Sequence, residues 1–162
     1  MTLRLSPIGI IPAGVSQHLS GATLADVADE AEEVGEVGHA DFRFELNYNH
    51  ANGLITNVDL TMHLTVVLPV WDNHAKRPKP EKDEWDRFLR ALRAHEDGHI
   101  AIFQREAPTT YNRLRAAKPK TMEKVLADET ARIWRLSKVY DHQTDHGRKQ
   151  QTPHGTTVIQ VP

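Results

Sequence analysis

The chain has 162 residues, of which 39% are hydrophobic and 26% are charged, and its formal net charge at pH 7 is -2. These values predict a single domain over residues 1–162, with residues 1–15 and 148–162 at its periphery. No basic stripe stands out and no run approaches the ~18 apolar residues of a membrane span, so neither a nucleic-acid partner nor a transmembrane helix is expected. There is no cysteine, so a metal site would have to use His, Asp or Glu, and the ten histidines favour such a site.

The N-terminal segment makes a poor signal-peptide core, because Pro7, Gly9, Pro12 and Gly14 interrupt its apolar residues. The sequence therefore leaves open an intracellular protein or a mature form with a new start. Residues 6–20 are expected to be irregular or briefly extended. A helix is predicted over 24–34, ending near Gly35, because Thr23 and the acidic residue three positions later form a capping box.

Two amphipathic strands follow this helix. Residues 41–48 alternate strictly between apolar and polar side chains, and residues 54–68 do the same after a turn that ends in Asn52-Gly53. The pattern predicts an antiparallel hairpin. If the 57–68 strand lies at a sheet edge, an extended peptide could add to it by β-augmentation.

The second half of the chain is helical in pattern. Apolar residues recur at three- and four-residue steps from about residue 80, Pro108 is expected to end or kink that helix, and 109–117 adds a turn or two. A last long helix is predicted over 121–142, and a short strand over 156–161. Strands that precede helices indicate an α+β fold, with a short N-terminal helix and an antiparallel sheet packed against two long helices in a zincin-like arrangement.

The first long helix carries the sequence His95-Glu96-Asp97-Gly98-His99, which is an H-E-x-x-H pattern. Four residues of helix bring His95 and His99 onto one face, roughly 6 Å apart along the axis, where both imidazoles can bind one Zn²⁺. Glu96 lies on the flank of that face, within reach of a metal-bound water. Two ligands and a general base in five residues are typical of a zinc hydrolase.

A third ligand must come from another segment. Glu106 lies seven residues beyond the second histidine, about 10 Å along the axis, which is too far for the same ion. Glu129 in the last helix would complete a His-His-Glu site. The segment 140–147 offers His142 and His146, or an aspartate, and Asp141 could instead orient a ligand histidine.

Several short motifs in this chain resemble those of a bacterial family of predicted secreted zinc-dependent proteases, long catalogued as a domain of unknown function. They are Ser20-Gly21 with Thr23; Leu68-Pro69 with Trp71; Trp85 with Phe88; Leu92 with His95-Glu96, Gly98 and His99; and Tyr140-Asp141 with Thr144, His146-Gly147 and Gln150. The resemblance covers about residues 16–150. It implies that His146 is the third ligand, that His142 is unconstrained, and that the protein is secreted or periplasmic.

The sequence and the resemblance together favour a zinc metallopeptidase that acts on a peptide or protein substrate. Glu96 is expected to be the general base, and Tyr140 or His142 to hydrogen-bond the developing oxyanion. Asp141 would orient a ligand, and Thr144 with Gly147 would shape the turn that presents His146. The alternative is a non-catalytic module in which the metal joins the two long helices, where Glu96 has no role.

Overall fold

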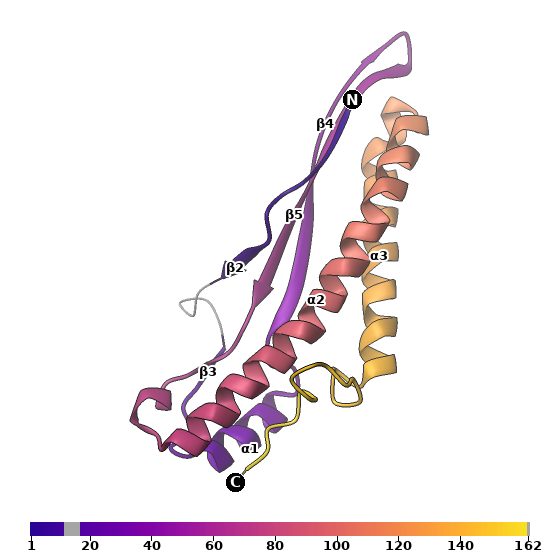
Figure 1. Cartoon of the computed structure of the whole chain (residues 1–162). Coiled ribbons are helices and arrows are strands. Elements are labelled where there is room, and N and C mark those ends of the chain that lie inside the picture. The colour runs from indigo at the N-terminus through magenta and orange to yellow at the C-terminus, as the bar shows by residue number, and fades with distance from the viewer. Residues whose placement is uncertain (12–16, 162) are drawn as a thin grey trace.

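A long β-hairpin and two long helices make up most of the fold in the computed structural model, which describes residues 1–11 and 17–161 (Figure 1). The hairpin is formed by β4 (His39–Ala51) and β5 (Leu54–Val67), and the long helices are α2 (Lys79–Ala116) and α3 (Met122–Thr144). The short helix α1 (Leu24–Val34) packs near the N-terminal half of α2. The predicted α+β class, with a short helix and a sheet against two long helices, is confirmed.

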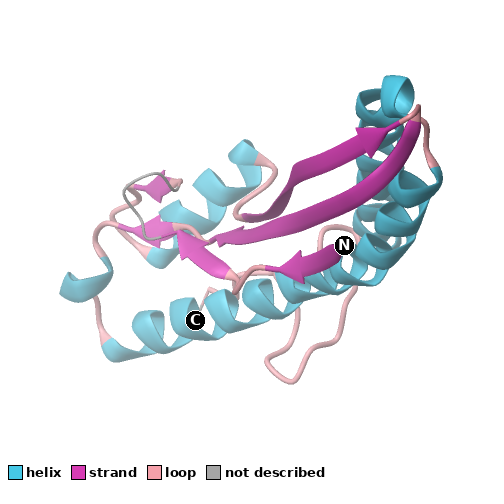
Figure 2. Cartoon of the chain, turned by 90° about the horizontal axis from the view of Figure 1, so that it is seen from above, coloured by secondary structure: helices cyan, strands magenta, loops and turns pink. Residues whose placement is uncertain are grey.

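The sheet is mixed rather than antiparallel, because β5 has partners on both sides. It pairs antiparallel with β4, with Phe42 opposite Leu64, and parallel with two short strands, β1 (Thr2–Leu5) and β2 (Gly9–Ile11). β5 is therefore an inner strand, and the expectation that it offers an edge to a peptide is wrong. In Figure 2 the strands lie side by side over the long helices.

Two further short strands close the end of the molecule near α1. β3 (His18–Leu19) pairs in parallel with β6 (Val70–Trp71). The predicted irregular stretch 6–20 thus contains strand residues on both sides of 12–16, which lie outside the described residues. Single-turn 3₁₀ helices, His74–Lys76 and Pro119–Thr121, precede α2 and α3.

α1 begins where its capping box predicts. The backbone N–H of Asp26 donates to Thr23 Oγ1 at 3.2 Å, and the backbone N–H of Thr23 donates to Asp26 Oδ2 at 2.8 Å. α1 ends before Gly35, which has a φ of 80°. The helix predicted over 24–34 is confirmed with these bounds.

α2 runs through Pro108, so of the two expected effects of this proline, an end or a kink, the end is wrong. Proline removes one N–H donor to the carbonyl four residues earlier. Ala107, Thr110 and Leu114 on either side of it are fully buried, and their packing holds the backbone helical. At ~1.5 Å per residue, the 38 residues of α2 extend about 57 Å along the hairpin.

The C-terminal tail after α3 is irregular, and the strand predicted over 156–161 is wrong. Its backbone hydrogen-bonds to side chains instead of to a neighbouring strand. The Arg87 guanidinium donates to the carbonyls of His154, Thr156 and Val158, and the N–H of Gln160 donates to Glu84 Oε1. Figure 1 shows the tail crossing from the end of α3 towards α1.

The core follows the buried stripe of α2. One apolar cluster joins Phe88 and Leu92 of α2 to α1, and another joins Phe103 to the hairpin residues Phe42 and Met62. His95 and His99 lie on the same stripe between these two clusters. In the part of the chain that the structure describes, no helix combines the length and apolar character of a membrane span.

Candidate metal centre

Two buried imidazoles of α2 face each other across one helical turn. His95 and His99 are 3% and 5% exposed, and their Nε2 atoms are 3.3 Å apart. The four-residue spacing brings the two rings onto the face of α2 that packs against α3. The pair predicted from H-E-x-x-H thus forms on the buried face, as expected for two ligands of one ion.

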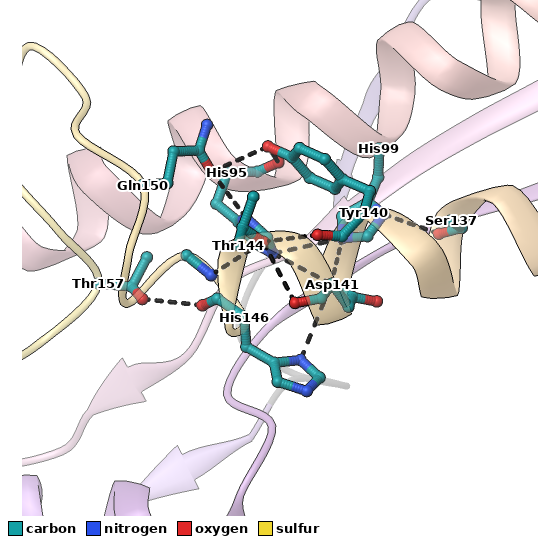
Figure 3. A network of polar contacts seen from close by, with 10 residues as sticks. His95, His99, Ser137, Tyr140, Asp141, Thr144, His146, Gln150 and Thr157 are labelled. Carbon is teal, nitrogen blue, oxygen red and sulfur yellow. Dashed lines mark hydrogen bonds and ion pairs between the residues drawn. The ribbon is translucent and has the colours of Figure 1, made fainter.

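The carboxylate of Asp141 on α3 completes a compact group of donor atoms (Figure 3). Its Oδ1 lies 2.8 Å from Nε2 of His99 and 3.3 Å from Nε2 of His95. These three residues offer donor atoms that all lie within 4.8 Å of one another. Asp141 was expected to orient a ligand histidine without binding the metal itself. In the structure it contacts the same nitrogen atoms that a metal would use.

The spacing of these atoms fits a small ion with nitrogen and oxygen ligands. Tetrahedral Zn²⁺ at ~2.0–2.1 Å from its ligands requires the ligand atoms to lie about 3.3 Å apart. Two of the three separations in the group are 3.3 Å, and the third is 2.8 Å. The chemistry of the set also fits, because two imidazoles and a carboxylate without thiolates suit zinc and other first-row divalent ions.

The outer nitrogen of each imidazole has its own partner. His95 Nδ1 lies 3.0 Å from Gln150 Oε1, and His99 Nδ1 lies 2.7 Å from Ser137 Oγ. An amide oxygen only accepts, so Nδ1 of His95 carries the proton and its Nε2 is left with the lone pair when the ring is neutral. Fixing the tautomer in this way is the usual support for a metal-binding histidine.

Burial and ion pairing act in opposite directions on this group. Burial raises the pKa of Asp141, but its contacts with His95 and His99 outweigh that effect and hold the pKa well below its usual range. Burial likewise lowers the pKa of His95, while hydrogen bonds to Asp141 and Gln150 raise it by more. The metal-free group therefore favours an ionised carboxylate beside protonated imidazole, and a bound cation would take the place of that proton charge.

Glu96 lies beside the group and is 3% exposed. Burial raises its pKa to about 7, against the charges of His99 and His95. Within residues 1–11 and 17–161 its carboxylate accepts no hydrogen bond, and it lines a cleft together with His95 and Asp141. A buried carboxylate with free lone pairs at the wall of a cleft is available to exchange protons.

Tyr140 packs against α2 at the level of the imidazoles. Its ring stacks on His95 at 5.0 Å between centroids, and its hydroxyl donates to Gln150 Oε1 at 2.9 Å. Gly98 makes this approach possible, because a Cβ there would lie 2.1 Å from the Tyr140 hydroxyl oxygen. These contacts suit a residue that positions His95; the catalytic role expected for Tyr140 stays a prediction.

A left-handed turn after α3 carries His146 to the mouth of the cleft. Asp145 and His146 both have φ of 51°, and Thr144 Oγ1 donates to the Tyr140 carbonyl at 2.9 Å while accepting from the N–H of Gly147 at 3.4 Å. His146 Nδ1 is 3.8 Å from Asp141 Oδ1, and its side chain is 53% exposed. His146 therefore lies next to the donor group without belonging to it.

The other two candidate ligands lie elsewhere. His142 is exposed on α3, one residue beyond Asp141. Glu129 is buried, but it pairs with Arg113 and Arg132, and it precedes Asp141 by twelve residues or about 18 Å of helix. The structure does not bring Glu129 to the histidines.

Sequence reasoning did not identify Ser137 at all. It lies four residues before Asp141, so the two share a face of α3, and it is 3% exposed. A small polar residue on the apolar stripe of a helix was the only signal, and such residues are often satisfied by the backbone of their own helix.

Comparison with known proteins gives one match. A family model described as "Bacterial protein of unknown function (DUF922)" matches residues 17–147, which include the H-E-x-x-H pattern, Asp141 and His146. No curated protein and no solved structure matches the chain.

Proposed function

The chain belongs to the DUF922 family of bacterial proteins, and we propose that this member is a zinc-dependent metallopeptidase. The observation that carries the proposal is the position of Glu96. Its buried carboxylate accepts no hydrogen bond in the described residues and lines a cleft beside the His95, His99 and Asp141 donor group. A helix with this pattern packed beneath a sheet also supports the expected zincin-like arrangement.

In the proposed reaction the ion would activate the water, and a side chain of the protein would transfer the protons. Zn²⁺ in such a site lowers the pKa of a water to about 7 and polarises a carbonyl. Glu96 would take the proton that the attacking water loses and would deliver it to the leaving amine. Its pKa of about 7 applies to the metal-free protein; a cation beside it would lower that pKa and favour the ionised form, which a base requires.

We propose Asp141 as the third ligand, because its Oδ1 already lies with the two Nε2 atoms. The resemblance implies His146 instead, whose half-exposed ring lies at the cleft mouth. In our assignment, His146 is free to donate a hydrogen bond to the carbonyl oxygen of a substrate as it gains charge. Tyr140 would hold His95 through its stacked ring and through Gln150.

A non-catalytic module is the second candidate. The donor group joins α2 to α3, so a metal there would stabilise the pairing of these helices without any reaction. Only Glu96 separates the two functions, because a structural site needs no proton acceptor in a cleft.

The decisive experiment combines metal analysis with turnover of an unfolded protein substrate by wild type and Glu96→Gln. We expect one zinc per chain in both, with turnover by Glu96→Gln lower by about 10²–10⁴-fold. The matched control is Asp97→Asn, one residue along α2, whose exposed side chain pairs with Arg93; it should retain activity. No turnover by the zinc-loaded wild type would contradict the enzyme and favour the module.

Metal analysis of the same purified proteins also tests which ion is bound and which residue is the third ligand. Asp141→Ala should lose tight zinc binding, whereas His146→Ala should keep the ion and lose part of the turnover. The reverse pattern would make His146 the ligand. Stoichiometric iron instead of zinc would contradict the hydrolase, since two histidines and one carboxylate also suit non-haem Fe(II).

A further inference from the structure

The cleft beside Glu96 extends away from the donor group between apolar walls, and this cavity, its polar end included, has a volume of about 100 Å³. Its walls come from three separate segments. α1 contributes Ala28 and Ala31, α2 contributes Phe88 and Leu92, and the tail contributes Val158 and Ile159. The polar residues His95, Glu96 and Asp141 line the same cleft, so an occupant of the cavity is continuous with whatever lies at the metal centre.

We propose that this cavity is a specificity subsite for a Leu-, Ile- or Val-sized aliphatic side chain next to the scissile peptide bond. The assignment rests on the function proposed above and adds the class of substrate. Ligand sites of this kind combine an apolar concavity with a few polar groups at one end, as this cleft does.

The volume limits the occupant. A cavity of ~150 Å³ in a protein core accepts benzene, which has six carbon atoms. By the same scale the cavity of about 100 Å³ accepts at most roughly four carbon atoms, the size of an isobutyl or sec-butyl group. A methyl group would leave most of the cavity unfilled, and an indole would exceed it.

Small residues on α1 create the space. Ala28 and Ala31 are three positions apart, so they share one face of the helix, and that face is directed at the cleft. Phe88 and Leu92, four positions apart on α2, form the opposing wall and are buried in the apolar cluster under α1. A larger side chain at position 31 would occupy the space that the substrate is proposed to fill.

Charge opposes an acidic occupant. Glu96 and Asp141 line the inner part of the cleft, and Glu32 and Glu36 line it from α1 and the following loop. A carboxylate buried among these four acidic residues would meet like charges, and the cationic side chain at the cleft that could offset them, Arg148, is exposed. A basic side chain is the real competitor, because Glu32 and Glu36 could receive its charge, and the experiment must separate these two preferences.

The test profiles cleavage sites in a mixture of unfolded peptides for zinc-loaded wild type, Ala31→Leu and the control Ala25→Leu. Ala25 is exposed on the same helix and does not line this cleft. Wild type should favour Leu, Ile or Val over Ala at one position flanking the bond, by about 10- to 100-fold in kcat/KM. Ala31→Leu should shift that preference to Ala and Gly, and Ala25→Leu should leave it unchanged.

Two further measurements keep the proposal testable if Ala31→Leu fails to fold or if the protein shows no turnover. Val158→Ala alters a side chain that is 44% exposed, so it spares the core, and it should admit larger residues such as Phe. Metal-free wild type should bind N-acetyl-leucinamide more tightly than N-acetyl-alaninamide, with NMR shifts at Ala31 and Val158. That binding without hydrolysis would support the subsite while contradicting the peptidase.

A preference for Lys or Arg would overturn the proposal, because the acidic residues rather than the apolar walls would then select the substrate. Cleavage without preference would also overturn it, as would a preference that Ala31→Leu and Val158→Ala leave unchanged. If neither hydrolysis nor the leucinamide shifts are observed, both the subsite and the peptidase are contradicted.

Discussion

Gly98 and Tyr140 hold the two long helices at the distance that the donor group needs. The Tyr140 hydroxyl lies over the Gly98 Cα, where a Cβ would be 2.1 Å away, and the Tyr140 ring stacks on His95. A glycine inside a helix usually costs stability, but here it permits close contact between α2 and α3. The glycine within H-E-x-G-H therefore has a packing explanation in this chain.

Gly98→Ala should destabilise the protein, although replacing a glycine inside a helix by alanine usually stabilises it. In most helix interiors this change stabilises by about 0.5–1 kcal/mol. Here the added methyl must displace Tyr140, and overpacking costs about 1–3 kcal/mol. We expect a net loss of about 1–2 kcal/mol in the free energy of unfolding, measured by urea denaturation, and weaker zinc binding by calorimetry. The exposed control Ala101→Gly should follow the usual rule, and a more stable Gly98→Ala would contradict the described contact.

At this scale the sequence predicted the histidine pair and Glu96, because one helical turn fixes their relation. It did not predict that Asp141 contacts both Nε2 atoms. That contact depends on the depth and rotation at which α3 packs on α2, and on the left-handed turn at Asp145 and His146. Long-range packing of this kind leaves no local pattern in the sequence.

The C-terminal tail is a separate element that side chains of α2, Arg87 above all, hold in position. Arg87 donates to three tail carbonyls and is itself held by Glu84. Thr157 Oγ1 adds a bond to the carbonyl of His146 at 2.8 Å. Because Val158 and Ile159 form one wall of the cleft, Arg87 helps to hold that wall in place.

Arg87→Ala should release the tail while leaving α2 and α3 folded. We expect faster amide hydrogen exchange over residues 152–160, with little change in the circular dichroism spectrum. The control is Arg90→Ala, which removes an exposed arginine three residues further along α2. Equal exchange in both variants would show that other contacts hold the tail.

Elements with strong periodicity were predicted from the sequence, and elements held by distant partners were not. The capping box and the alternating strands predicted α1, β4 and β5. The short strands β1 and β2 exist only through pairing with β5, more than fifty residues away. The apolar residues near 158 suggested a strand, but their backbone partners are the side chains of Arg87 and Glu84.

On the scale of the whole molecule, the donor group lies where three segments meet. α2 supplies two imidazoles, α3 supplies Asp141 and Ser137, and the tail supplies Gln150. Two of the core clusters adjoin this position on either side. An ion bound there would stabilise the assembled fold, because the separate segments of the unfolded chain cannot offer the same site.

Removing the metal should therefore lower the thermal stability. Zinc at 100 times its Kd contributes about 2.7 kcal/mol, and for a chain of this size that shifts Tm by roughly 5–10 °C. Scanning calorimetry with excess zinc and then with chelator measures the difference. His99→Ala should show no zinc-dependent shift, and the control His63→Ala, in β5, should behave as wild type. A shift that persists in His99→Ala would place the ion elsewhere.

The most direct test of the metal centre is a crystal structure of the zinc-loaded protein with anomalous data collected across the zinc edge. We predict one anomalous peak between His95 Nε2, His99 Nε2 and Asp141 Oδ1, at about 2.0–2.2 Å from each. Glu96 should lie beside the ion without binding it. A peak away from the histidine pair, or no ordered zinc in the crystal, would contradict this account.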